Sequence, residues 1–146
     1  GRSVDVVVVG GGIVGCATAR ALAARGASVV LLEQNSLTSG STWHAAGLLG
    51  TLKGSSLLQA LANYGARTYE TMNDESTGKS LVGWTNTGSL GIARCSDSLE
   101  QLVRQLQLAR GLGYTQHRHV TPSEIADIHP FLNLEGIVGG VYSPAD

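Results

Sequence analysis

Three glycines near the start of the chain have the spacing of a phosphate-binding turn. Gly10, Gly12 and Gly15 form a G-x-G-x-x-G pattern directly after the β-branched run 4–9, which is the context that makes this pattern informative. The first glycine permits a sharp turn, the second lets a pyrophosphate approach the backbone, and the third lets helix and strand pack closely. The helix that follows offers N–H groups and a partial positive charge to phosphates.

One acidic residue completes the pattern. Glu33 ends a second apolar run, 28–33, at the position where a carboxylate accepts hydrogen bonds from an adenosine ribose. Its charge disfavours the 2′-phosphate of NADP. The sequence therefore predicts a site for the ADP part of NAD or FAD, without deciding between them. The alternative is a glycine-rich turn in an unrelated α/β fold, with Glu33 as a solvated strand end.

A segment of small residues around one bulky pair follows. Residues 38–48 read Thr-Ser-Gly-Ser-Thr-Trp-His-Ala-Ala-Gly-Leu. Small residues let the backbone lie against a flat ligand, and their hydroxyl and N–H groups can reach its phosphates and ring edges. Trp43 fits a packing role beside such a ring.

The elements that must position these residues follow from periodicity and turn residues. The fold class is α/β, because a strand, a helix and a second strand open the chain. In the first part of the chain we expect strand 4–9, helix 13–25 ending at Gly26, strand 28–33, and a shaped loop 34–54 with short local structure. A helix from Ser55 or Ser56 to about Met72 follows, and then two short strands within 82–93 joined at 86–88. The last expected elements are a helix capped by Asp97 and ending at Gly111 or Gly113, strand 117–120, a helix starting at 121–124 and ending at 129–130, and strand 137–142.

Composition excludes several classes. The net charge is −1 and charged residues are 14% of the chain, so no broad basic surface for nucleic acid is expected. No apolar run is long enough to cross a bilayer. Cys16 and Cys95 suggest neither a disulfide framework nor a zinc site. His117 and His119 have no third ligand at suitable spacing, so a solvated strand face is expected and no metal.

The chain resembles the FAD-dependent amine oxidoreductases of the D-amino-acid-oxidase superfamily. It looks closest to the branch of sarcosine dehydrogenase and dimethylglycine dehydrogenase, through residues 31–34, 40–48, 83–90 and 142–146. The resemblance implies a Rossmann-like FAD-binding domain that continues into an α+β substrate domain. The cofactor contacts carried over by it, or by the glycine pattern, are Gly10, Gly12, Ile13, Val14, Gly15, Glu33, Gln34, Gly40, Ser41, Thr42, Trp43, His44, Ala45, Ala46, Gly47 and Leu48.

The resemblance gives His44 a chemical role. In that family the matching histidine carries the flavin covalently through the 8α-methyl group, after this methyl has lost a proton. A histidine suits the reaction because it keeps a nucleophilic nitrogen near neutral pH, which lysine does not. The alternative is that His44 only packs or forms hydrogen bonds beside FAD.

The implied reaction is oxidation of an N-methylated amino acid of the sarcosine or dimethylglycine type, by hydride transfer to the flavin. The implied partners are this small substrate and an electron-transferring flavoprotein, and folate in the full-length protein. Two alternatives stay open. One is an amine oxidase with non-covalent FAD. The other is a non-catalytic relative, such as the regulatory subunit of pyruvate dehydrogenase phosphatase, whose pattern lacks the Trp-His pair.

The chain is expected to be a piece of a longer FAD-dependent oxidoreductase. Residues 1–54 would form the ADP-binding βαβ unit and the flavin loop. Residues 55–146 would form helices and short strands of the same domain, incomplete at the C-terminus. No catalytic residue is expected within it, because the substrate-binding residues would lie beyond Asp146. A matrix location in mitochondria is implied if the source is eukaryotic, and a cytoplasmic one otherwise.

Overall fold

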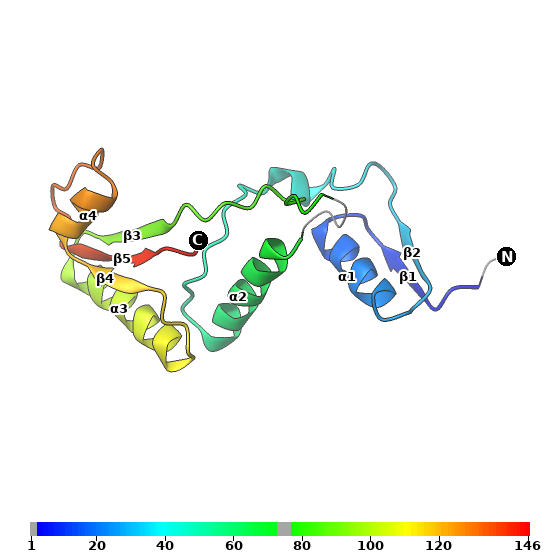
Figure 1. Ribbon diagram of the computed structural model, residues 1–146, viewed down its shortest axis with the longest axis horizontal. Coiled ribbons are helices and arrows are strands. Elements are labelled where there is room, and N and C mark those ends of the chain that lie inside the picture. Colours follow the sequence, from blue (N-terminus) through cyan, green and yellow to red (C-terminus); the bar gives the residue numbers. More distant parts are fainter. Residues whose placement is uncertain (1–2, 73–76) are drawn as a thin grey trace. The chain divides into compact units, whose positions relative to one another are not determined.

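The computed structural model describes residues 3–72 and 77–146. The chain divides into two compact units, with the boundary between Leu48 and Leu49. Figure 1 shows the helices and strands of each unit along the chain. No helix in the described part of the chain combines the length and the apolar character needed to span a membrane.

The first unit is a parallel βαβ arrangement. Strand β1 (Val6–Val9) leads through the glycine turn into helix α1 (Ile13–Ala23), and the chain returns as strand β2 (Val29–Leu32). The two strands pair in parallel from Val6 opposite Val29 to Val9 opposite Leu32, as Figure 1 shows. This confirms the predicted α/β class, with strands slightly shorter than expected.

The strands of this unit are half-buried on one face and exposed on the other. Alternate side chains of β1 and β2 are exposed, and Val9 is 82% exposed. Within this unit α1 covers one face of the strand pair, and successive side chains of a strand point to opposite faces.

Helix α1 ends just before Gly26, as the sequence predicts. Gly26 has a φ of +89°, a left-handed conformation that glycine adopts without a steric penalty. Its N–H donates to the Ala23 carbonyl at 2.9 Å, and the Ala27 N–H donates to the Leu22 carbonyl at 3.2 Å. These two bonds form a Schellman motif, which turns the chain back toward β2.

The second unit contains a three-stranded antiparallel sheet with helices against it. Its elements are α2 (Ser56–Glu70), β3 (Ser89–Ala93), α3 (Ser96–Gly111), β4 (Arg118–Val120), α4 (Pro122–Ile128) and β5 (Gly139–Ser143). Strand β5 lies between β3 and β4. Its hydrophobic core centres on Val120, Ile125 and Ile137.

Two predicted helix starts of this unit are confirmed. The Ser55 hydroxyl caps α2 by accepting from the Leu58 N–H at 3.3 Å. Thr121 and Glu124 form a reciprocal capping box at the start of α4, with Pro122 in the first position, as the sequence predicts.

The predicted hairpin within 82–93 is wrong. Strand β3 forms, but it pairs with β5, so that Ser89 lies opposite Ser143. Among residues 86–88 only Gly88 has a positive φ, +79°, whereas a tight type I′ turn needs two such residues. The Gly88 N–H instead donates to the Asp146 carbonyl at 2.8 Å. Pairing with a distant strand therefore replaces the local turn.

The predicted cap of α3 is displaced by two residues. The N-cap is Cys95, and Asp97 lies in the first turn of the helix. The Cys95 N–H donates to the Ser98 hydroxyl at 3.3 Å, and hydrogen bonds from Ser98 lower the pKa of the Cys95 thiol. Asp97 still favours the helix, since a negative charge in the first turn complements the helix dipole.

The solvated face expected at His117 is also wrong. His117 is fully buried, and its Nδ1 lies 2.9 Å from the Ser143 hydroxyl oxygen. Its Nε2 is buried without a hydrogen-bond partner in the described part of the chain. Burial lowers the pKa of His117, while the negative charge of Asp146 acts in the opposite direction. His119 is exposed, as expected for a solvated strand residue.

Candidate dinucleotide-binding site

The glycine turn has the geometry that its sequence predicts at both ends. Gly10 has a φ of +105°, which explains a glycine at the sharp exit from β1. A Cβ at Gly15 would lie 1.9 Å from the Gly10 carbonyl oxygen and 3.5 Å from Val8 Cγ1. Only glycine therefore lets α1 lie this close to the end of β1.

The two middle glycines make room for side chains of this chain. A Cβ at Gly11 would lie 2.6 Å from Leu37 Cδ2 and 3.0 Å from Glu33 Cβ. A Cβ at Gly12 would lie 3.1 Å from the Thr42 hydroxyl oxygen. The fingerprint does not single out Gly11, and its role depends on a contact with a residue more than twenty positions later.

Glu33 is tied to the glycine turn through both carboxylate oxygens. One accepts from the Gly11 N–H at 2.7 Å and the other from the Asn35 N–H at 2.9 Å. The N–H groups of Asn35 and Gly11 lower the pKa of this carboxyl, since they stabilise its charged form. Each carboxylate oxygen has a second lone pair, so these bonds leave acceptor capacity for a ribose hydroxyl.

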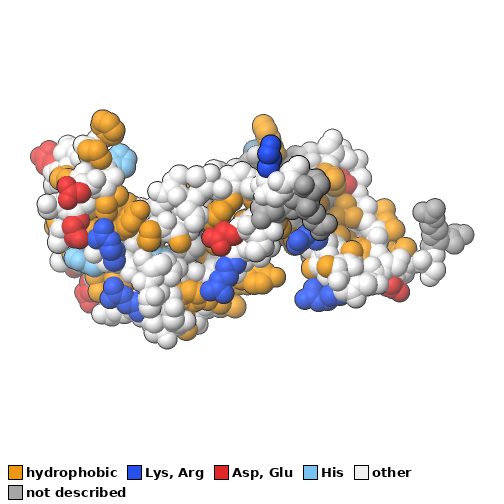
Figure 2. Space-filling view, in the orientation of Figure 1, with side chains coloured by type: hydrophobic (Ala, Val, Ile, Leu, Met, Phe, Trp, Pro, Cys, Tyr) orange, Lys and Arg blue, Asp and Glu red, His pale blue; other side chains and the backbone are white. Residues whose placement is uncertain are grey.

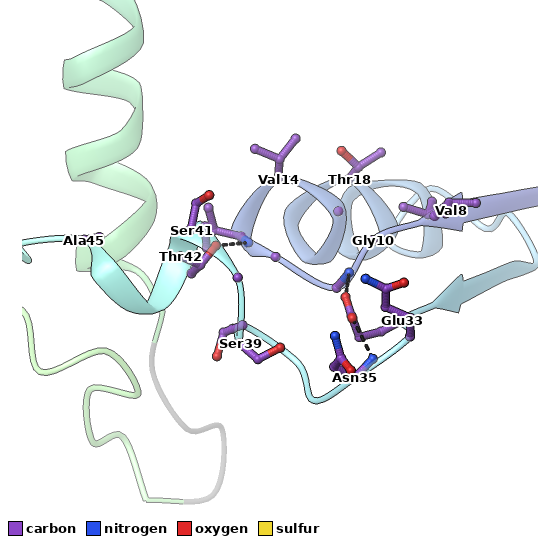
Figure 3. Close-up of a pocket in the computed structure, with 18 residues that line it drawn as sticks. Val8, Gly10, Val14, Thr18, Glu33, Asn35, Ser39, Ser41, Thr42 and Ala45 are labelled. Carbon is purple, nitrogen blue, oxygen red and sulfur yellow. Dashed lines mark hydrogen bonds between the residues drawn. The ribbon is translucent and has the colours of Figure 1, made fainter.

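A cleft of about 760 Å³ opens over the glycine turn. Figure 3 shows Glu33 and Asn35 on one side of it and Ser41 and Thr42 on another, with Val14 and Thr18 above on α1. The predicted residues that line it are Gly10, Gly12, Ile13, Val14, Gly15, Glu33, Gln34, Gly40, Ser41, Thr42 and Ala45. Those outside its lining are Trp43, His44, Ala46, Gly47 and Leu48.

Several lining residues were missed by the sequence analysis. Thr18 lies one helical turn after Val14, so helix periodicity could have found it. Asn35 lies in the bend after β2, where no strand periodicity applies. Thr38 has a φ of +66°, and no other non-glycine residue in the described part of the chain has a positive φ. Its N–H donates to the Gly11 carbonyl at 2.9 Å, a loop contact that no local pattern announces.

The charge of the cleft comes from Glu33, the one charged side chain in its lining. Lysine and arginine side chains occupy separate places on the face shown in Figure 2 and do not form a patch. A bound phosphate would therefore be stabilised by the helix N-terminus and its backbone N–H groups.

The 38–48 loop contains a short 3-10 helix, η1 (Ser41–His44), which agrees with the local structure expected there. Trp43 is 74% exposed, and its ring meets that of His44 edge to face at a centroid distance of 6.2 Å. The Nδ1 of His44 lies 3.2 Å from the Gly40 carbonyl oxygen. A carbonyl only accepts, so Nδ1 carries the hydrogen, and in the neutral ring Nε2 holds the free lone pair.

The fold and the turn together define a dinucleotide-binding βαβ protein. The chain belongs to the FAD dependent oxidoreductase family (DAO), which its sequence matches over residues 5–146. It is 38% identical over 143 residues to human mitochondrial sarcosine dehydrogenase, covering 97% of this chain and 15% of that protein. It is equally identical, at 38%, to the mouse mitochondrial pyruvate dehydrogenase phosphatase regulatory subunit, covering 97% of this chain and 16% of that one.

A solved structure shares the same fold. The crystal structure of glycine oxidase from Bacillus cereus superposes with a TM-score of 0.78 at 30% identity, covering 97% of this chain and 39% of the enzyme chain. The chain thus spans well under half the length of the proteins it matches. The resemblance seen in the sequence is confirmed at the level of the family.

Proposed function

We propose that this chain holds the ADP half of FAD in a flavoenzyme that oxidises an N-methylated amino acid. The observation that carries the proposal is the glycine turn. Its half-buried Gly10 and Gly12 line a cleft of about 760 Å³, a volume in the range of small-molecule sites. Family membership over residues 5–146 supports FAD over NAD as the ligand. The residues that line the cleft fit the ADP part of FAD.

Each part of the cleft has a task toward this cofactor. The N-terminus of α1 would hold the pyrophosphate, with the Val14 N–H as a backbone donor, since the Ile13 N–H is bonded to the Thr42 hydroxyl. Glu33 would accept from the ribose hydroxyls while its bonds to Gly11 and Asn35 keep it in place. Ser41 and Thr42 would offer hydroxyl groups to the phosphate side. When bound, FAD supplies the hydride acceptor that the protein side chains lack.

His44 is proposed as the covalent attachment residue. Its Nδ1 is engaged by the Gly40 carbonyl at 3.2 Å, which directs the lone pair of the neutral ring to Nε2. The imidazole is exposed, so this nitrogen is open to attack an electron-poor carbon of the flavin. The hydrogen bond also fixes the tautomer of the ring, as second partners commonly do for functional histidines.

The substrate class is proposed from the relatives. One similar protein is named sarcosine dehydrogenase and is mitochondrial, which supports an N-methyl amino acid substrate and a matrix location. An electron-transferring flavoprotein as acceptor and a folate-binding region in the full-length protein belong to the same proposal. The catalytic residues would lie outside this chain.

One alternative has a specific observation in its favour. The regulatory subunit of pyruvate dehydrogenase phosphatase matches as strongly as the dehydrogenase, at 38% identity. A regulatory protein would keep the fold and dispense with turnover.

Acid precipitation of the full-length protein separates these functions. The proposal predicts a yellow pellet, because covalent flavin stays with the protein. It also predicts reduction of an artificial dye with sarcosine or dimethylglycine, and not with glycine, which lacks the N-methyl group. A colourless protein that turns over none of these would favour the regulatory function. A colourless pellet from an active enzyme would favour non-covalent FAD.

A further inference from the structure

Helix α1 receives its N-terminal cap from the 38–48 loop. Its own N-cap residue is Gly12, which has no side chain to accept a hydrogen bond. The Thr42 hydroxyl oxygen takes this role by accepting from the Ile13 N–H at 3.0 Å, across 29 positions of sequence. An N-cap hydroxyl satisfies a backbone donor that would otherwise depend on solvent or ligand.

Thr42 anchors the 38–48 loop on the glycine turn through its side chain, in addition to the backbone bond from Thr38 to Gly11. Every other residue of the loop is exposed, whereas Thr42 is half-buried. A Cβ at Gly12 would lie 3.1 Å from the Thr42 oxygen, tighter than most real contacts. The absence of a side chain at Gly12 therefore makes room for the Thr42 hydroxyl.

The anchor extends to His44 through one short turn. The Trp43 N–H donates to the Gly40 carbonyl at 3.3 Å, and the Ala45 N–H donates to the Thr42 carbonyl at 3.2 Å. The His44 ring bonds to the same Gly40 carbonyl. Since Thr42 and His44 both belong to η1, fixing Thr42 on the N-terminus of α1 also fixes the backbone that carries the His44 ring.

The hydroxyl hydrogen of Thr42 is still available. A hydroxyl has one donor and two acceptor positions, and the bond from Ile13 uses an acceptor position. No acceptor for the Thr42 hydrogen is found among residues 3–72 and 77–146. Thr42 lines the cleft, so it can accept from the helix and donate to a phosphate oxygen at once.

We propose that Thr42 is a positioning residue, which couples the α1 phosphate site to the orientation of His44. This role rests on the proposed FAD function. The hydroxyl holds the 38–48 loop on the glycine turn before the cofactor arrives. It then bridges the helix N-terminus and the pyrophosphate, so that the attachment ring is already in place.

The test uses full-length protein with Thr42→Val, which keeps the shape and removes the hydroxyl, and Thr42→Ser, which restores it. Ser36→Ala is the matched control, because Ser36 is exposed and does not line the cleft. Hydrogen exchange is measured without FAD on peptides covering the start of α1 and the 38–48 loop. Exchange across β1 and β2 reports whether the first unit of each variant is folded.

We expect exchange at both sites to rise roughly two- to tenfold in Thr42→Val, as loss of one neutral hydrogen bond predicts. Thr42→Ser and Ser36→Ala should match the wild type. Equal exchange at these two sites in Thr42→Val and wild type, with β1 and β2 protected in both, would overturn the positioning role.

A second measurement follows the rate of covalent flavin uptake after FAD is added. Thr42→Val should take up flavin more slowly, with rescue by Thr42→Ser. Faster exchange in Thr42→Val, together with no flavin uptake by the wild type, would support the anchor and overturn the proposed function. Unaltered uptake by Thr42→Val would overturn the coupling to His44.

Discussion

Replacing Gly15 with alanine tests the close approach of α1 to β1. Alanine usually stabilises a helix position by about 0.5–1 kcal/mol relative to glycine. At Gly15 the new Cβ would meet the Gly10 carbonyl oxygen at 1.9 Å, where real Cβ atoms keep at least 3.0 Å. The oxygen belongs to the backbone of a tight turn and the Cβ is fixed on the backbone of α1, so neither atom can rotate away.

The clash should exceed the gain in helix propensity. Overpacking in a well-packed region costs about 1–3 kcal/mol, and we expect the upper end because the backbone must move. After the helix gain is subtracted, α1 should lose about 2 kcal/mol of local stability. That loss corresponds to an opening equilibrium raised roughly thirtyfold.

Thiol labelling of full-length protein measures this opening directly. Cys16 is half-buried beside Gly15 in α1, whereas Cys95 is exposed and serves as an internal reference. Labelling of the Cys16 peptide should accelerate roughly thirtyfold in Gly15→Ala. The matched control is Gly65→Ala in α2, where a Cβ meets nothing within 4 Å. Unchanged Cys16 labelling and normal FAD retention in Gly15→Ala would refute the steric reasoning.

Two further predictions concern charge. Glu33→Gln should weaken FAD retention without unfolding the protein, because the amide keeps one acceptor and places an NH₂ donor against the N–H of Gly11 or Asn35. Glu33→Asp and thermal melting serve as controls. Full FAD retention by Glu33→Gln would show that Glu33 is only a strand-end residue. The folded state should also lose stability as the pH falls below the unfolded histidine value of about 6.5, because burial lowers the pKa of His117 and only the unfolded chain then takes up the proton. This slope between pH 7.5 and 5.5 should be smaller in His117→Asn, and identical slopes in thermal melts would show that His117 does not cause it.

The first βαβ unit could be predicted from the sequence because its determinants are local. Gly10, Gly15 and Gly26 act on neighbouring backbone, and each has the conformation or contact that its position indicates. The capping box of Thr121 and Glu124 is local in the same sense. Such signals need no knowledge of the rest of the fold.

The errors arise where a distant partner decides the outcome. Strand β3 pairs with β5, about fifty residues later in the chain, so the turn before it never closes a hairpin. His117 is buried, and its ring forms a hydrogen bond with Ser143 at the end of β5, 26 positions later. The contact of Thr42 with Ile13 spans 29 positions. Neither the hydrophobic periodicity nor the turn residues of a short sequence segment predict these long-range contacts.

The most direct test of the central claim is the mass of one peptide. The tryptic peptide that follows Arg25 and ends at Lys53 contains Glu33, Thr42 and His44. From acid-precipitated full-length protein, we predict this peptide with the mass of a flavin added, and fragmentation that places the flavin on His44. In His44→Ala the same peptide should have its unmodified mass, and the FAD should wash out on acid treatment. An unmodified wild-type peptide from an active holoenzyme would contradict the role assigned to His44.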